Sequence, residues 1–364
     1  MTTPLRQPFF RALTPSVHGG VDAGELARCG LTPEAVIDFS ANQSPLGPAP
    51  HVVAAVASAV LDAYPDRDAH PLALAIATRH GVSADQVVTG NGSTELIRLI
   101  AQLALMPGTA VLAVTPTFGE YRVATELAGA HWVEFPLTAE EGFALDIQRL
   151  YTALRATRPV LCWWCAPNNP TGTAAVPEAV AAVIKAHPET LFVLDEAYCD
   201  LLPAPQWTPA LLEAGNLIVL RSMTKAWGLA GVRLGYALGT AGLMGALRGA
   251  KPPWNVNACA QAAGIAALVD TTQYTQTLAL LLAERQHLVK ALKEQGWPVV
   301  SSAAAFFLID VGDAAAIKRR LLAHGCLVRD CTSFGLPAYV RVSPRRPEQN
   351  ARLLEAFAAV RCAG

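Results

Sequence analysis

Short apolar runs alternate with amphipathic segments from about residue 85 to residue 240. In segments such as 94–105 and 176–187, Ala, Leu, Ile and Val recur at helical spacing. The apolar runs between them are continuous, which is typical of strands buried on both faces. This alternation predicts an α/β fold in which helices cover both faces of a mostly parallel, seven-stranded sheet. Its strands are expected at QVVTG, AVLAVTP, HWVEFP, PVLCWWCAP, LFVLDEAY, LIVLRS and RLGYALG.

The pattern changes after Pro252 and Pro253. A long helical region is expected from about 257 to 295, followed by a short strand at FFLID and a helix near 313–324. Two further strands, CLVRD and AYVRV, precede a final helix from about 347. This mixture of elements predicts a smaller C-terminal α+β domain.

The chain of 364 residues is too long for one small core, so more than one structural unit is expected. Its first residues are rich in Pro and Gly and are expected to form an arm that packs with the small domain. The predicted units are the N-terminal arm at 1–48, the large domain at 49–255 and the small domain at 256–364.

Composition excludes several classes of protein. Lys and Arg total 28 against 29 Asp and Glu, so no basic surface for nucleic acid or an anionic membrane is expected. No apolar run approaches the roughly 18 residues of a transmembrane helix. The N-terminal MTTPLRQPFFRALTP lacks the apolar core of a signal peptide. These features predict a soluble, cytoplasmic protein.

Cysteine usage does not suggest a disulfide scaffold, because eight cysteines are spread over a long chain. Cys162 and Cys165 form a CxxC pair within an apolar run that reads as a buried strand. A second pair at metal-ligand spacing is absent from the sequence, so structural thiols are expected rather than a redox or zinc site. No metal is predicted.

The polar residues of interest follow the predicted strands, where open α/β sheets bind their ligands. After QVVTG, the segment GNGSTELIRLI is a glycine-rich turn that runs directly into a helix. Such a turn offers backbone N–H groups and the positive end of the helix dipole to an anion. Ser93 or Thr94 could equally be an ordinary N-cap.

Asp195 directly follows the apolar run LFVL, where a carboxylate is costly unless it is paired. A pyridinium nitrogen is one possible partner, and an arginine or backbone amides are the alternative. The segment APNNPTG ends another strand, and it could be only a turn, because Asn, Pro and Gly favour turns.

The segment SMTKAWGLAGVRLGY contains Lys225 and Arg233 among apolar residues and glycines. Alone, it could be a half-buried turn with two satisfied charges. The order along the chain is more specific: a glycine-rich anion turn, PTFGEY, PNNPTG, DEAY and then this lysine segment. Together these supply two phosphate clamps, a stacking aromatic ring, partners for a phenol oxygen and a pyridine nitrogen, and an amine. That set predicts pyridoxal 5'-phosphate as the cofactor.

With these motifs, the sequence resembles the fold-type I pyridoxal-phosphate enzymes of the class I/II aminotransferase superfamily over nearly its whole length. Within that group it is most similar to the threonine-phosphate decarboxylases of cobalamin biosynthesis, close relatives of the histidinol-phosphate aminotransferases. The segments that carry this similarity are HGG, DFSAN, PLG, YPD, PTFGEY, LRSMTK, PWNVNA and RDCTSF.

The resemblance implies a role for each matching residue. Phe118 would stack on the pyridine ring, and Asn169 and Tyr198 would bind its phenolic oxygen. Asp195 would keep the ring nitrogen protonated, and Lys225 would attach the cofactor. Tyr64 would reach the cofactor of a second subunit, which implies a homodimer with shared active sites. The cofactor phosphate would be held by Gly92, Ser93, Thr94, Ser222, Thr224 and Arg233.

The substrate would be a small phosphorylated amino acid, gripped by His18, Arg329 and Arg341. The implied reaction is decarboxylation of L-threonine O-3-phosphate to 1-amino-2-propanol phosphate. Transamination of histidinol phosphate needs the same cofactor residues, so the motifs between 90 and 236 leave both reactions open. The retained lysine argues against a third alternative, a non-catalytic ligand sensor. Ser44 and Ala305 stand where relatives commonly have Asn.

Overall fold

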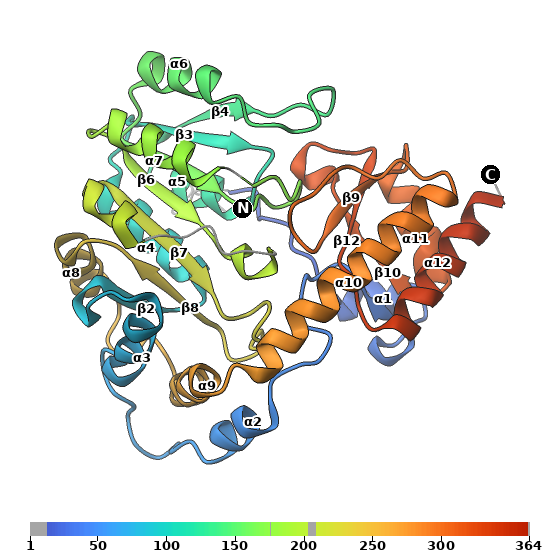
Figure 1. Cartoon of the computed structure of the whole chain (residues 1–364), viewed down its shortest axis with the longest axis horizontal. Helices are drawn as coiled ribbons and strands as arrows, with labels where there is room; N and C mark the ends of the chain where they lie inside the picture. Colours follow the sequence, from blue (N-terminus) through green and yellow to red (C-terminus); the bar gives the residue numbers. More distant parts are fainter. Residues whose placement is uncertain (1–12, 175, 203–208, 363–364) are drawn as a thin grey trace, which may run out of the picture.

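The computed structural model describes residues 13–174, 176–202 and 209–362 (Figure 1). A seven-stranded sheet forms its centre, with the order β2-β8-β7-β6-β5-β3-β4. Only β8 runs antiparallel to its two neighbours, so the predicted mostly parallel sheet is confirmed. The strands are β2 (Val87–Asn91), β3 (Ala110–Thr115), β4 (His131–Pro136), β5 (Leu161–Cys165), β6 (Leu191–Asp195), β7 (Leu217–Ser222) and β8 (Leu234–Leu238).

Alternate residues of each strand enter two apolar clusters on opposite faces of the sheet. In β5, Leu161 and Trp163 join the cluster that includes α4, α5 and α8, whereas Cys162 and Trp164 join the cluster under α3, α6, α7 and α9. Both faces are therefore covered, which explains why the strands read as continuous apolar runs. These helices are α3 (His70–His80), α4 (Ser93–Ala104), α5 (Glu120–Leu127), α6 (Ile147–Thr157), α7 (Pro177–Ala186), α8 (Ala241–Ala250) and α9 (Ala258–Val269).

The C-terminal elements surround a three-stranded antiparallel sheet of order β11-β12-β9, as the α+β prediction requires. The expected long helical region is two helices, because Asp270 separates α9 from α10 and caps the Thr272 N–H. Figure 1 shows α10 extending from the region of α9 toward the three-stranded C-terminal sheet. The elements are α10 (Thr272–Glu294), β9 (Phe307–Asp310), α11 (Ala314–Ala323), β10 (Cys326–Leu327), β11 (Arg329–Asp330), β12 (Tyr339–Val342) and α12 (Pro347–Cys362).

The described part of the N-terminal arm contacts these C-terminal elements. It contains α1 (Ala23–Arg28) and β1 (Ile37–Asp38), and β1 pairs in parallel with β10; α2 (Pro50–Ala57) follows. Phe39 is fully buried in the C-terminal apolar cluster, so this segment also contributes to a core, unlike the expected arm. The domain boundaries at 48 and 255 stay a prediction. Within the described ranges, no helix is long and apolar enough to cross a membrane.

A buried ion pair joins β6 to β7 at the ends that carry the candidate site. Arg221 Nη2 lies 2.8 Å from Glu196 Oε2, and both side chains are only 5% exposed. Arg221 Nη1 also contacts Asp200 at 3.4 Å and the Cys199 thiol. Burial raises the pKa of Glu196, and the charge of Arg221 opposes that rise. The pair therefore fixes the chain just after Asp195 against the chain just before Ser222.

Arg221→Met is expected to lower the free energy of unfolding by about 3–5 kcal/mol, because Glu196 stays buried without its cation. Urea titration followed by circular dichroism measures this change. Lys290→Met is the control, since it breaks an exposed pair with Glu294 and should change the free energy by less than about 1 kcal/mol. Equal effects in the two variants would contradict a structural role for the buried pair.

Candidate active site

A cavity of about 430 Å³ opens at the carboxyl ends of the parallel strands. It brings together segments of the N-terminal arm, the strand ends of the central sheet and the C-terminal sheet. The predicted residues that line it are His18, Ser93, Thr94, Phe118, Asn169, Asp195, Tyr198, Ser222, Thr224, Lys225, Arg233, Arg329 and Arg341. Thirteen residues that the sequence analysis singled out thus line one pocket.

Two predicted residues lie outside this lining. Gly92 precedes Ser93 and has a φ of 76°, a left-handed conformation that favours glycine. A side chain there would also meet the Arg233 guanidinium at 2.8 Å. Tyr64 is 80% exposed and stacks on Trp254, with 4.6 Å between ring centroids. Its predicted action on a second subunit stays a prediction.

One end of the pocket is rich in hydrogen-bond donors. Helix α4 begins at Ser93, so its first N–H groups have no partner within the helix. The Ser222 and Thr224 hydroxyls lie 2.7 Å apart beside it, and Arg233 lines the same pocket. The backbone of Gly235 in β8 packs closely under this turn, because a Cβ there would lie 2.5 Å from the Ser93 nitrogen. Such a donor set suits an anion.

The floor of the pocket contains a buried carboxylate. Asp195 ends β6 and is 3% exposed. Its Oδ2 accepts a hydrogen bond of 2.6 Å from the Tyr121 hydroxyl, and its Oδ1 accepts one of 2.9 Å from the Ala197 N–H. Burial raises the pKa of Asp195, while these two hydrogen bonds and the charge of Lys225 oppose the rise.

Lys225 lies on the segment that follows β7. Its Nζ is 5.6 Å from the centre of the Tyr198 ring, and that ring packs edge-on against Phe306. The Lys225 carbonyl accepts the Ser44 N–H at 3.1 Å, which ties the lysine segment to the N-terminal arm. The amine therefore lies near an aromatic ring, and its charge favours the ionised form of Asp195.

Two buried arginines lie side by side in the lining of the pocket. Arg329 in β11 and Arg341 in β12 are direct partners in the antiparallel ladder and are 7% and 4% exposed. Opposed residues project from the same face, where like charges repel. Burial and the charge of Arg341 both lower the pKa of Arg329.

The hydrogen-bond partners of these arginines are neutral. Arg341 donates to the Asn169 side chain and, at 2.5 Å, to the Ser40 carbonyl. Arg329 donates to the Val17 carbonyl at 2.8 Å and to the Ser333 hydroxyl at 2.6 Å. The two charges thus remain available to a bound anion, which would also relieve their repulsion.

His18 lines the pocket with a side chain that is about half exposed. Its Nε2 donates to Glu120 Oε1 at 3.1 Å, and Arg98 donates to the other oxygen of Glu120 at 2.5 Å. The hydrogen bond from His18 and the nearby Arg98 lower the pKa of Glu120 to about 2. The His18 ring lies 5.6 Å from that of Phe118.

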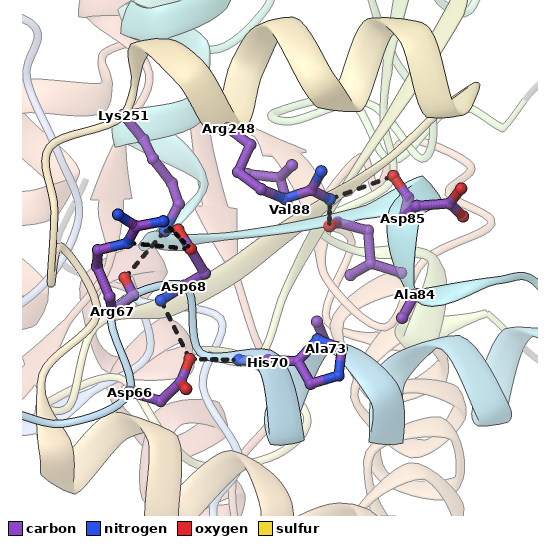
Figure 2. Close-up of a pocket in the computed structure, with 11 residues that line it drawn as sticks. Asp66, Arg67, Asp68, His70, Ala73, Ala84, Asp85, Val88, Arg248 and Lys251 are labelled. Atoms are coloured by element: carbon purple, nitrogen blue, oxygen red, sulfur yellow. Dashed lines mark hydrogen bonds and ion pairs between the residues drawn. The ribbon is translucent and has the colours of Figure 1, made fainter.

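A second cavity, of about 520 Å³, has a different character. Figure 2 shows it where β2 begins, at the end of the strand remote from Ser93. Its charges pair with one another: Arg67 and Lys251 both contact Asp68, at 3.0 and 3.3 Å. Arg248 donates to the Asp85 and Val87 carbonyls. This cavity gathers none of the predicted site residues.

The remaining sequence observations lie away from the described lining of the active-site pocket, with one exception. Ser44 bonds to Thr277, and Ala305 is fully buried in an apolar cluster. Cys162 is buried in β5, and burial raises its pKa well above the usual range. Cys165 does line the pocket, which the sequence reading did not anticipate. Burial likewise raises its pKa.

Sequence reasoning also missed Glu120 and Tyr121. Both belong to PTFGEY, in which the sequence analysis assigned a role only to Phe118. A glutamate and a tyrosine at the start of a buried helix were the available signal, but their partners lie 102 and 74 residues away in the chain.

Comparisons with known proteins agree with this geometry. The family model Aminotransferase class I and II matches residues 34–357. Histidinol-phosphate aminotransferase 1 of Thiobacillus denitrificans is 38% identical over 360 residues, which cover 97% of this chain and 92% of the relative. A histidinol-phosphate aminotransferase of Symbiobacterium thermophilum is 39% identical over 329 residues, covering 89% of this chain and 90% of that relative.

Solved structures give the same fold. Histidinol-phosphate aminotransferase from Sinorhizobium meliloti, in complex with pyridoxal 5'-phosphate, has a TM-score of 0.85 and 27% identity, covering 95% of this chain and 96% of that chain. L-threonine-O-3-phosphate decarboxylase from Porphyromonas gingivalis has a TM-score of 0.78 and 28% identity, covering 88% of this chain and 98% of that chain. The protein belongs to the class I and II aminotransferase family, and its cofactor is pyridoxal 5'-phosphate.

Proposed function

We propose that this enzyme is an aminotransferase that acts on histidinol phosphate or a related phosphorylated amino acid. The observation that carries the proposal is the pair of buried, like-charged arginines, Arg329 and Arg341, in the same pocket as Lys225. Such a pair suits a doubly charged phosphate on the substrate. The relatives named above favour this reaction over the decarboxylation that the sequence motifs implied.

The residues fit the cofactor. The donor-rich end around Ser93 and Ser222 suits its phosphate. A carboxylate buried at the pocket floor suits a protonated ring nitrogen, since Asp195 otherwise has only neutral donors. Phe118 lines the pocket as a stacking surface for the ring, and Asn169 and Tyr198 line it as partners for the phenolic oxygen. Lys225 is the amine for covalent attachment.

When bound, pyridoxal phosphate supplies an electron sink for negative charge at the substrate Cα. The protein's own groups supply the rest. Asp195 holds a proton at the ring nitrogen by charge. The Lys225 amine, once free, would act as the general base that accepts the Cα proton. Arg329 and Arg341 orient the substrate by its phosphate, so that this Cα–H bond faces the lysine.

The proposal includes a homodimer. Tyr64 is exposed and rigidly stacked on Trp254, away from the pocket of its own chain. It would complete the cofactor-phosphate site of a second copy.

A second candidate is the decarboxylation of L-threonine O-3-phosphate. It is favoured by the proximity of the HGG and RDC segments: Arg329 donates to the His18 carbonyl at 3.4 Å within the pocket. His18 would then join the arginines around a shorter substrate. Both reactions use the same cofactor residues, so only product analysis separates them.

The test supplies purified holoenzyme with histidinol phosphate and 2-oxoglutarate, and separately with threonine O-phosphate and no acceptor. We expect glutamate to form in the first reaction and no carbon dioxide to be released in the second. Carbon dioxide from threonine phosphate, with no glutamate from histidinol phosphate, would replace the proposal by the second candidate.

Arg329→Ala is expected to raise KM for histidinol phosphate by about ten-fold to a hundred-fold, because a hydrogen bond to a charged group contributes about 1.5–3 kcal/mol. Steady-state kinetics measure the change. Arg248→Ala in the second cavity is the control and should leave KM unaltered. With unphosphorylated histidinol, wild type and Arg329→Ala should behave alike; an equal loss on both substrates would mean that Arg329 does not bind the phosphate.

Gly235→Ala is expected to weaken cofactor binding by at least about ten-fold, since its Cβ would displace the Ser93 N–H from the phosphate site. Equilibrium dialysis of the apoenzyme with pyridoxal phosphate measures this affinity. Gly245→Ala is the matched control, because that glycine in α8 has open space around it. Unchanged affinity in Gly235→Ala would exclude the Ser93 turn as the phosphate site.

A further inference from the structure

Tyr121 is a fully buried tyrosine whose hydroxyl points at the pocket floor. Its ring stacks nearly parallel on the Trp163 ring, with 5.1 Å between ring centroids. It also packs edge-on against the Phe118 ring, with 5.6 Å between ring centroids. The Thr125 hydroxyl donates to the Tyr121 carbonyl and accepts from Trp163 Nε1, which links the two aromatic residues through α5. The ring therefore has little freedom to rotate away from Asp195.

The hydrogen bond to Asp195 is short and shielded from water. It spans 2.6 Å, and Tyr121 and Asp195 are 0% and 3% exposed. Burial raises the pKa of Tyr121 well above its usual range, so the hydroxyl keeps its proton and acts as the donor. With the Ala197 N–H on the other oxygen, each carboxylate oxygen is oriented by one hydrogen bond and retains the capacity to accept another.

We propose that Tyr121 is a positioning residue that aims the Asp195 carboxylate and keeps it ionised for the ring nitrogen of the cofactor. The inference rests on the proposed role of Asp195. A hydrogen bond to the charged form of a carboxylate favours that form, and here it opposes the large cost of burial. Without the hydroxyl, Asp195 would be neutral over more of the working pH range and could not hold the ring nitrogen protonated.

The other groups around Asp195 do not substitute for this hydroxyl. Lys225 attracts the carboxylate by charge, but its amine is committed to the cofactor in the holoenzyme. Cys165 lies beside both Tyr121 and Asp195, and burial keeps its thiol protonated. Glu196 is a neighbouring carboxylate, and the charge of Asp195 raises its pKa, so Glu196 offers Asp195 no stabilising contact. Tyr121 is thus the strongest neutral donor that faces the carboxylate.

The test is Tyr121→Phe, which removes the hydroxyl and keeps the ring. In apoenzyme labelled with [¹³Cγ]aspartate, the Asp195 resonance, identified from Asp195→Asn, reports its protonation midpoint. We expect the midpoint to rise by about one to two pH units. In the holoenzyme, kcat should fall by about ten-fold to a hundred-fold with an unchanged KM for histidinol phosphate.

Tyr236→Phe is the matched control, because that buried hydroxyl bonds to His80, outside the active-site lining. It should leave both the Asp195 midpoint and kcat unchanged. If Tyr121→Phe does not fold, replacement of tyrosine by 3-fluorotyrosine, a stronger donor, should lower the midpoint in the otherwise unaltered chain. An unchanged midpoint in either experiment overturns the inference.

The observations that would contradict the proposed function differ from those that would overturn the role of Tyr121. Borohydride trapping of the cofactor on a lysine other than Lys225, or full activity in Asp195→Asn, would remove the site on which the inference rests. An inactive Asp195→Asn enzyme beside an unaltered Tyr121→Phe enzyme would overturn the role of Tyr121 alone.

Discussion

Burial of charge at the carboxyl end of the central sheet is the constraint on which this site depends. Asp195 and Glu196 are adjacent at the end of β6, and both are almost inaccessible to water. Because a buried carboxylate is costly without a partner, each requires its own. Glu196 takes Arg221 from β7 and lies outside the pocket lining. Asp195 takes only neutral donors, and so remains free to pair with a cationic group in the pocket.

The C-terminal sheet contains buried cations, where the end of β6 contains buried carboxylates. Arg221 is neutralised by carboxylates, whereas Arg329 and Arg341 contact backbone carbonyls, an amide and a hydroxyl. Carbonyl dipoles orient the guanidinium groups without cancelling their charge. Since these carbonyls belong to Val17 and Ser40, the same contacts hold the N-terminal arm against the C-terminal sheet. The arm is therefore part of the proposed anion site.

The seven central strands could be predicted because burial on both faces makes each one a continuous apolar run. The antiparallel direction of β8 could not be predicted. The apolar pattern of RLGYALG suits a buried strand of either direction, and only its hydrogen-bond partners define that direction. Candidate residues such as Asp195 and Lys225 could also be predicted, because they follow the ends of predicted strands in the sequence. Tyr121 and Glu120 were not, because their importance comes from contacts with residues far away in the sequence.

The distribution of these residues along the chain also explains why the family motifs define the cofactor better than the reaction. The proposed cofactor contacts between residues 92 and 233 lie on the central sheet and on the turns that follow its strands. His18, Arg329 and Arg341, the proposed substrate contacts, lie on the arm and the C-terminal sheet, apart from the strand ends of the central sheet. Asn169 connects the two groups, because its side-chain oxygen accepts a hydrogen bond from Arg341 and Asn169 is itself a proposed cofactor contact in the pocket lining. A shift of Arg341 would therefore also move the Asn169 amide, the proposed partner of the phenolic oxygen of the cofactor. Under the proposed function, substrate orientation rather than cofactor chemistry would select between transamination and decarboxylation.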